Sequence, residues 1–254
     1  MKKRILLAGE TFIVTQSVAI GNDVLTSSSR SNGARIFKHA IETSPYELEQ
    51  LASESCETDF PRSTSALDRY SAVVLSDIGA LSLLLTPESR SGKISVNRLV
   101  MLNDWIKSGG SLMMAGGYNS FQGMSGSARY HGTPLEECLP VNCLPHSDGL
   151  EAPEGLSTVI LQNHPIIEGL PQLLPPILGM NKTVLKPDDQ SSAILNVAYR
   201  GVSHPLLAIR EHGKGRTLAW MTDIGPHWMS QDFVNSPVYA PLMRNMMAWL
   251  CNDL

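Results

Sequence analysis

Short apolar runs that alternate with helical patterns are the feature that most restricts how this chain can fold. Three runs have the length of a buried strand: Ile5–Ala8, Ala72–Leu75 and Ser111–Ala115. Segments with helical spacing of apolar residues lie between them, at Gly33–Thr43 and Ser95–Ser108. Strands that are apolar throughout are typical of a parallel sheet with helices on both faces. The pattern therefore predicts an α/β fold with a mostly parallel sheet.

The rest of the chain adds an edge strand and an antiparallel pair. Tyr46–Leu51 alternates between apolar and polar residues, which indicates a strand at the edge of the sheet. Pro205–Arg210 and Arg216–Met221 flank a Gly-Lys-Gly turn, so we expect them to pair as an antiparallel hairpin. A last helix is expected to begin near Pro241, where a missing N–H costs little. No linker or repeat divides the chain, and residues 1–254 are predicted to form one domain.

Composition limits which binding partners and which cellular location we expect for this protein. The net charge is −4 and the basic residues are scattered, which favours neither nucleic acid nor an anionic membrane surface as a partner. We expect a small-molecule ligand, with a homo-oligomer as an open option. No stretch approaches the roughly 18 apolar residues of a membrane span. The four cysteines form neither a disulfide framework nor a zinc pattern, and a cytoplasmic location is predicted.

Several motifs, in order along the chain, resemble one family. The segments GGSLMMAGGYNSF (residues 109–121), YHGTPLE (130–136) and DIGPHW (223–228) resemble the putative glutamine amidotransferase-like family, a branch of the class I glutamine amidotransferase superfamily. NHPIIEGLP (163–171) and GKGR (213–216) resemble the related trehalose-utilisation proteins. The resemblance implies a flavodoxin-like three-layer sandwich.

The same resemblance implies a catalytic cysteine that this chain lacks. In class I amidotransferases the cysteine lies on the turn after a strand, which here reads Ala-Gly-Gly-Tyr-Asn, with Gly117 near the nucleophile's position. Glycine has no side chain with which to attack an amide. The family's catalytic histidine corresponds to His227, but Trp228 and Met229 follow it where a glutamate is usual. Glutaminase activity is therefore expected to be absent.

Candidate catalytic residues follow from the position of ligand sites at the carboxyl ends of strands. Asp77 and Asp223 each follow an apolar run in similar segments, and Glu10 follows the first run. We predict that His227, Asp223 and Asp77 surround one pocket. A histidine there could transfer a proton near neutral pH, and paired carboxylates could bind hydroxyl groups or a cation. The alternative is that both aspartates cap turns and that the histidine only supports the fold.

Candidate ligand-binding residues come from the glycine-rich turn and the loop after it. The turn could offer free N–H groups to an anion or simply allow a tight bend. The loop 123–134 is predicted to cover or rim the pocket, although a solvated loop histidine is the alternative. The predicted ligand-binding residues are Gly116, Gly117, Tyr118, Asn119, Tyr130 and His131.

Three hypotheses of function remain open at this point. The first is a protein that binds a small polar, sugar-like or amino-acid-like ligand without glutaminase activity. The second is an enzyme of different chemistry, such as a metal-assisted isomerase or hydrolase of a carbohydrate-like substrate that uses His227 with nearby carboxylates. The third is a partner subunit or scaffold. No cofactor is expected, and a divalent metal belongs only to the second hypothesis. The spacing of Cys138, Cys143 and His146 matches no standard zinc site.

Overall fold

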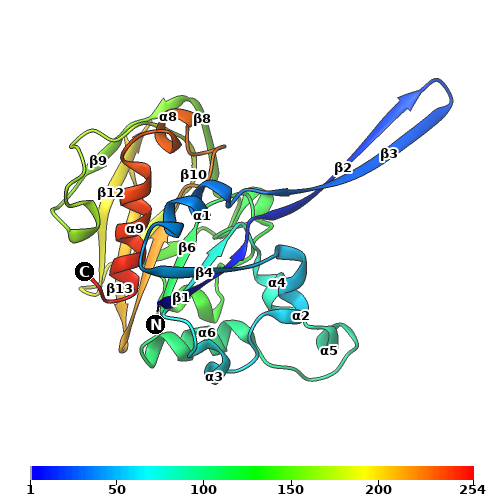
Figure 1. Cartoon of the computed structure of the whole chain (residues 1–254), viewed down its shortest axis with the longest axis horizontal. Coiled ribbons are helices and arrows are strands. Elements are labelled where there is room, and N and C mark those ends of the chain that lie inside the picture. Colours follow the sequence, from blue (N-terminus) through cyan, green and yellow to red (C-terminus); the bar gives the residue numbers. More distant parts are fainter. Residues whose placement is uncertain (1) are drawn as a thin grey trace.

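An eight-stranded sheet forms the centre of the computed structural model, which describes residues 2–254 (Figure 1). Its order is β4-β1-β5-β6-β14-β13-β12-β9. The strands are β4 (Tyr46–Leu51), β1 (Lys3–Gly9), β5 (Ala72–Ser76), β6 (Ser111–Ala115), β14 (Gly215–Trp220), β13 (Val202–His212), β12 (Ser191–Tyr199) and β9 (Thr158–Ile160). The first five are parallel and have the flavodoxin-like order, with β4 at the edge as expected.

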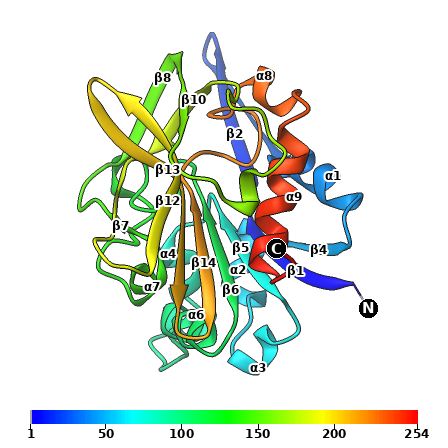
Figure 2. The ribbon, with the colours of Figure 1, turned by 90° about the vertical axis from the view of Figure 1, so that its left-hand side faces the viewer.

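Helices cover both faces of the parallel strands (Figures 1 and 2). Helices α1 (Arg35–Glu42) and α9 (Tyr239–Leu250) pack together on one face. Helices α4 (Ala80–Leu84), α6 (Arg98–Lys107) and α7 (Pro134–Cys138) cover the other. The predicted flavodoxin-like three-layer architecture is thereby confirmed.

Helix α6 begins three residues later than expected. The side chain of Asn97 accepts hydrogen bonds from the N–H groups of Leu99 and Val100, which fixes the start of the helix. Leu99 and Ile106 are buried as the helical pattern predicts, whereas Val100 is exposed. Adjacent residues differ by about 100° around a helix, so the face that buries Leu99 turns Val100 toward solvent.

The antiparallel part of the sheet is larger than predicted. The expected pair is present as β13 and β14, joined by the turn at Gly213. Strands β12 and β9 continue the antiparallel order beyond it. Two small sheets pair β8 (Gly149–Leu156) with β10 (Ile177–Asn181) and β7 (Val141–Cys143) with β11 (Thr183–Leu185).

A two-stranded arm projects from the body and was not predicted. It consists of β2 (Thr11–Ile20) and β3 (Asp23–Asn32), and Figure 1 shows it reaching well beyond the rest of the molecule. A Gly21-Asn22 turn joins the strands, with Gly21 at φ 59°. This dipeptide between two strand-like segments is a hairpin signal, and it was available in the sequence.

The remaining elements are short. They are the helices α2 (Cys56–Asp59), α3 (Thr64–Leu67), α5 (Pro87–Arg90) and α8 (Gln231–Val234), and the 3₁₀ turns η1 (Ser53–Ser55), η2 (Met124–Gly126) and η3 (Pro165–Ile167). The core consists of the central strands and the inner face of α9, including Met113, Met114, Leu242 and Met246. No helix in residues 2–254 is long and apolar enough to cross a membrane.

Candidate functional site

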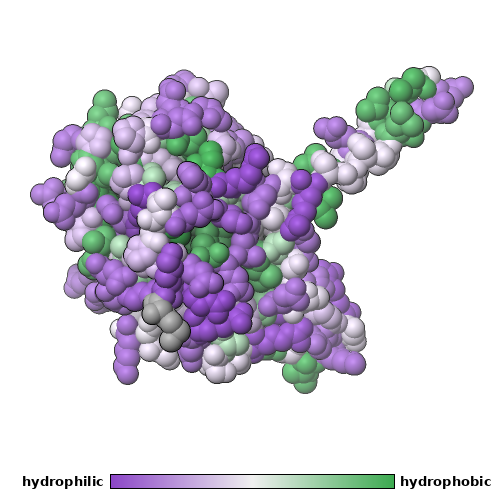
Figure 3. All heavy atoms as spheres, in the orientation of Figure 1, coloured by the Kyte–Doolittle hydropathy of each residue, from purple (hydrophilic) through white to green (hydrophobic). Residues whose placement is uncertain are grey.

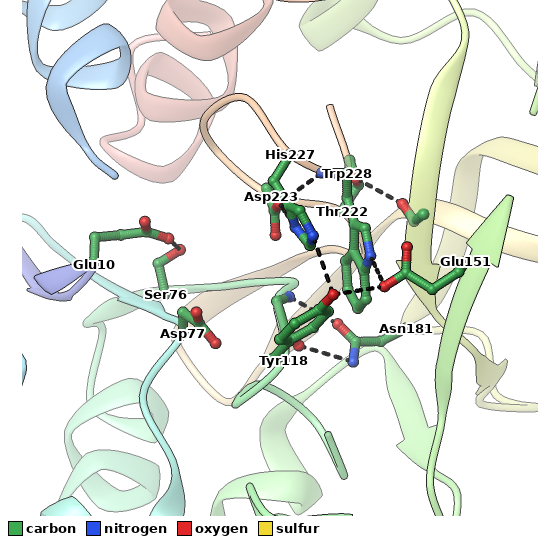
Figure 4. A network of polar contacts seen from close by, with 12 residues as sticks. Glu10, Ser76, Asp77, Tyr118, Glu151, Asn181, Thr222, Asp223, His227 and Trp228 are labelled. Atoms are coloured by element: carbon green, nitrogen blue, oxygen red, sulfur yellow. Dashed lines mark hydrogen bonds and ion pairs between the residues drawn. The ribbon is translucent and has the colours of Figure 1, made fainter. Parts of the chain in front are cut away.

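A small cavity opens where the carboxyl ends of β1, β5, β6 and β14 meet. It encloses about 230 Å³. Its lining residues are Glu10, Phe12, Gly33, Asp77, Tyr118, Asp223, Gly225, Pro226 and His227. Figure 4 shows the polar members of this set. The three predicted catalytic residues, His227, Asp223 and Asp77, thus lie around one cavity although they are far apart in the sequence.

Two acidic residues on one side of the cavity have raised pKa values. Glu10 follows β1 and accepts a 2.6 Å hydrogen bond from the Ser76 hydroxyl. Burial raises the pKa of Glu10 to about 8, and the nearby negative charges of Asp77 and Asp223 act in the same direction. Burial also raises the pKa of Asp77 to about 6, against the lowering effect of the Asn119 N–H that it accepts. Glu10 is therefore mostly protonated at neutral pH and offers a hydrogen-bond donor as well as acceptors.

His227 is held on the other side of the cavity by a chain of hydrogen bonds. Its Nδ1 lies 3.0 Å from Asp223 Oδ2, which also accepts the backbone N–H of Trp228. Its Nε2 lies 3.1 Å from the hydroxyl oxygen of Tyr118. The hydrogen bond to Asp223 raises the pKa of His227, and partial burial opposes it. A carboxylate that orients an imidazole in this way prepares it for proton transfer.

Tyr118 extends this chain to Glu151 on β8 (Figure 4). Its hydroxyl donates to Glu151 Oε1 at 2.9 Å, and the indole N–H of Trp228 donates to the same oxygen. Because the Tyr118 hydroxyl uses its proton in the hydrogen bond to Glu151, Nε2 of His227 must donate to the tyrosine oxygen. That arrangement requires protons on both ring nitrogens, which agrees with the raised pKa of His227.

Asp77 occupies the space that a side chain at position 117 would need. A Cβ built on Gly117 would lie 2.9 Å from Cγ and Oδ1 of Asp77, closer than real Cβ contacts allow. Gly117 also has φ +146°, where L-residues are strained. Position 117, which corresponds to the position of the nucleophilic cysteine, therefore has no room for a side chain. The carboxyl group of Asp77 lies beside it.

Three N–H groups of the glycine-rich turn are already used within the protein, which favours the tight-turn alternative over an anion-binding nest. The N–H of Gly116 donates to the Trp220 and Thr222 carbonyls, and that of Gly117 donates to Asn181 Oδ1. The N–H of Asn119 donates to Asp77. Of the four predicted turn residues, only Tyr118 lines the cavity.

The side chains of Asn181 and Asp148 hold this turn in place through hydrogen bonds. Asn181 donates from Nδ2 to the Gly117 carbonyl and to Asp148 Oδ1, at 3.1 and 2.8 Å. Asp148 also accepts the N–H groups of Gln122 and Gly123. Neither Asn181 nor Asp148 was predicted, because the sequence places them in segments with no motif.

The predicted roles of Tyr130 and His131 at the cavity are not supported by their positions. Tyr130 is fully buried, and its hydroxyl donates to the Ile78 carbonyl. His131 Nδ1 lies 3.0 Å from the Cys143 carbonyl, and neither residue lines the cavity. The loop 123–134 contributes no lining residue. Its apolar residues Ala128 and Tyr130 pack into the core instead. The high glycine and serine content of the loop gave no indication of this burial.

The four cysteines lie outside the cavity. All four thiols are buried, and burial raises the pKa of Cys138 to about 12 and that of Cys143 in the same direction. Neither cysteine lines the cavity. Within residues 2–254, no three His, Cys, Asp or Glu side chains are arranged to hold one metal ion.

A larger hollow of about 510 Å³ lies beside η3, next to the motif at residues 163–171. Within it His164 caps η3 by accepting the Ile166 N–H, and its ring packs against Trp249. The motif therefore packs η3 against α9, whereas the smaller cavity holds Glu10, Asp77 and His227, whose pKa values are raised.

The sheet order, the three layers and the turn after β6 define a protein with the class I glutamine amidotransferase-like fold. Residues 4–252 match the model of the family described as "Putative glutamine amidotransferase", and the chain belongs to this family.

Solved structures agree with this assignment. Cytoplasmic Protein STM3548 from Salmonella typhimurium is 32% identical, with a TM-score of 0.90 over 96% of this chain and 98% of that one. Cytoplasmic Protein STM1381 from Salmonella typhimurium LT2 is 31% identical, with a TM-score of 0.90 over 97% and 99%. PurLQS from Thermotoga maritima, at 15% identity and a TM-score of 0.55 over 98% and 100%, shares the fold. A search of curated proteins gives no match.

Proposed function

We propose that this protein binds a small, hydroxyl-rich, sugar-like ligand without negative charge in the cavity of Glu10, Asp77 and His227, and that it does not hydrolyse glutamine. The observation that carries the proposal is the charge of the lining. Three carboxyl groups and one histidine face the cavity, and none of its lining residues is a lysine or arginine.

The chemistry of the lining favours hydroxyl groups over anions. Carboxyl oxygens accept hydrogen bonds from hydroxyls, and protonated Glu10 can also donate one. Phe12 and Tyr118 add aromatic surface for the apolar face of a ring. The volume of about 230 Å³ is below the usual range for drug-sized ligands and suits a molecule of about one ring. A carboxylate or phosphate would be buried beside like charges, and the one cation that the lining can supply, protonated His227, is already paired with Asp223.

The same site supports the proposed absence of glutaminase activity. Glutamine carries an α-carboxylate, for which the lining has no lysine or arginine, and His227 is already paired with Asp223. The nucleophile's position is Gly117, and Asp77 fills the space beside it. The buried cysteines have raised pKa values, so they lack the thiolate that acyl transfer needs. The cytoplasmic names of STM3548 and STM1381 support a cytoplasmic location for this protein.

A second candidate function is an acid–base enzyme that acts on a ligand of the same class. The chain from Asp223 through His227 to Tyr118, with contacts of 3.0 and 3.1 Å, favours it. In this scheme the neutral form of His227, which keeps its proton on Nδ1 toward Asp223, takes a proton at Nε2 from a ligand hydroxyl or from Tyr118, and protonated Glu10 supplies one on the other side. The partner-subunit hypothesis has no comparable support at this site.

The test is calorimetric titration with four classes of compound: neutral monosaccharides, amino sugars, sugar phosphates and glutamine. We expect binding in the first two classes and none in the last two. His227→Ala and Asp77→Asn should each weaken binding at least tenfold. His131→Ala is the matched control, because this half-exposed histidine lies outside the cavity, and it should leave affinity unchanged.

Two results would reject the proposal: preferential binding of phosphates, or binding that survives both cavity substitutions. If a neutral sugar is also converted, NMR of the reaction mixture will detect product. Loss of that conversion in Tyr118→Phe with binding retained would favour the acid–base enzyme.

A further inference from the structure

The arm of β2 and β3 has almost no cover from its own chain. Every residue from Ile13 to Ser31 is exposed, and only its root contacts the body. Free-standing two-stranded ribbons are at best marginally stable in water. The register nonetheless runs without a break from Thr11 opposite Asn32 to Ile20 opposite Asp23. A ribbon this long and regular needs a further source of stability.

The two faces of the arm differ in chemistry, because successive cross-strand pairs point to opposite faces. On one face Val18 lies opposite Leu25, with Val14 and Ile20 two to four residues along the same strand. We call Phe12, Val14, Val18, Ile20 and Leu25 the apolar face.

The opposite face is mainly polar at its centre. Thr15 is hydrogen-bonded to Ser28 and Ser17 to Thr26, at 3.0 and 3.1 Å. Ile13 and Val24 lie toward its two ends. The apolar face also carries Gln16, Asp23 and the serines at 27, 29 and 31, so five of its ten residues are apolar, against three of ten on the opposite face.

The apolar face offers somewhat less apolar area than a standard protein interface. Four of its side chains, Val14, Val18, Ile20 and Leu25, are 42–61% exposed. At roughly 100 Å² each they expose about 400 Å² of apolar surface. A standard interface buries about 800 Å² on each partner, a little over half of it apolar. Figure 3 shows apolar residues gathered near the end of the arm, the part of the ribbon to which Val18, Ile20 and Leu25 belong.

We propose that the apolar face of the arm packs against the same face of a second copy of this chain, forming a two-fold dimer. A two-fold interface brings one patch against itself, and this patch carries little charge to repel its copy. Between Thr11 and Asn32 the only charged residues are Asp23 at the tip and Arg30 near the root, which pairs with Glu54. Nucleic acid or an anionic membrane would find no basic surface there.

Dimer formation through this face would also affect the cavity. Phe12 lies at the root of the apolar face and also lines the cavity. Docking of the arm would therefore fix one wall of the proposed ligand site in each copy.

Sedimentation equilibrium from 1 to 100 μM tests the proposal. The wild-type protein is expected at twice its chain mass of 27.7 kDa. Val18→Glu with Leu25→Lys should weaken the dimer at least 100-fold. Ser17→Glu with Thr26→Lys is the matched control, and it should change the dimer less than threefold. Both double variants place opposite charges across the two strands, so the hairpin itself is preserved.

A third variant tests the role of the arm independently of whether the two double variants still form the hairpin. Replacing residues 13–30 with Asn-Gly removes the arm and should give a monomer with the thermal midpoint of the body nearly unchanged. A wild-type monomer at 100 μM would overturn the proposal. So would a dimer that survives removal of the arm, or equal weakening by the two double variants.

Discussion

The carboxyl group of Asp77 lies where the side chain of residue 117 would be, with only 2.9 Å between Asp77 Cγ and a Cβ built on Gly117. In the sequence these residues are 40 positions apart, one after β5 and the other after β6. The resemblance to amidotransferases pointed to a missing cysteine at Gly117. The structure adds that the missing side chain has been replaced in space by a carboxyl group from the neighbouring strand.

We predict that Gly117→Ala destabilises the protein by about 1–3 kcal/mol, since overpacking and a φ of +146° both penalise the new Cβ. Adding Asp77→Gly should recover part of this loss by removing the contact but not the backbone strain. Urea unfolding of the two single variants and the double variant measures both effects. Fully additive losses in the double variant would show that the contact is unimportant.

Ammonia release from glutamine should be undetectable in the wild-type protein. The same assay with Gly117→Cys should also be negative, because the new thiol would meet Asp77 and the glutamate partner of the histidine is missing. Cys138→Ser and Cys143→Ser are the controls for a displaced nucleophile. Release from the wild type that either substitution abolishes would contradict the assignment of Gly117.

Glu10 should make the protein less stable as the pH rises. Its pKa is raised from 4.5 to about 8 in the folded state, so above pH 4.5 the folded protein holds a proton that the unfolded chain has lost. The stability linked to this proton is present below pH 4.5 and is lost as the pH approaches 8, by at most about 5 kcal/mol. Urea unfolding at pH 5 and pH 8 should show a smaller difference in Glu10→Gln than in the wild type. Glu47→Gln, an exposed change, should behave as the wild type.

Asp223→Asn should lower the pKa of His227, because the hydrogen bond to this carboxylate is the main cause of the raised value. The imidazolium contributes stability below the unfolded pKa of 6.5, and this contribution is lost as the pH rises through the higher folded value. NMR titration of the histidine ring protons measures the shift directly, with His131 as an internal reference. An unchanged His227 titration in Asp223→Asn would show that the pair is not formed in solution.

The sequence by itself determined much of the architecture and part of the site. Ile5–Ala8, Ala72–Leu75 and Leu112–Ala115 are apolar without interruption, and short runs of this kind are typical of strands buried on both faces. Parallel strands place their carboxyl ends on one edge, so Asp77, Asp223 and His227 could be assigned to one cavity before their distances were known.

Only the tertiary structure decided what surrounds those residues. Glu151 and Asn181 come from later strands, and nothing local in the sequence relates them to Tyr118 or Gly117. The sequence left open whether the glycine-rich turn has free N–H groups, and long-range contacts use those of Gly116 and Gly117. Apolar periodicity is a property of neighbouring residues, whereas the partner of a polar group depends on which distant segments the packed core brings to it.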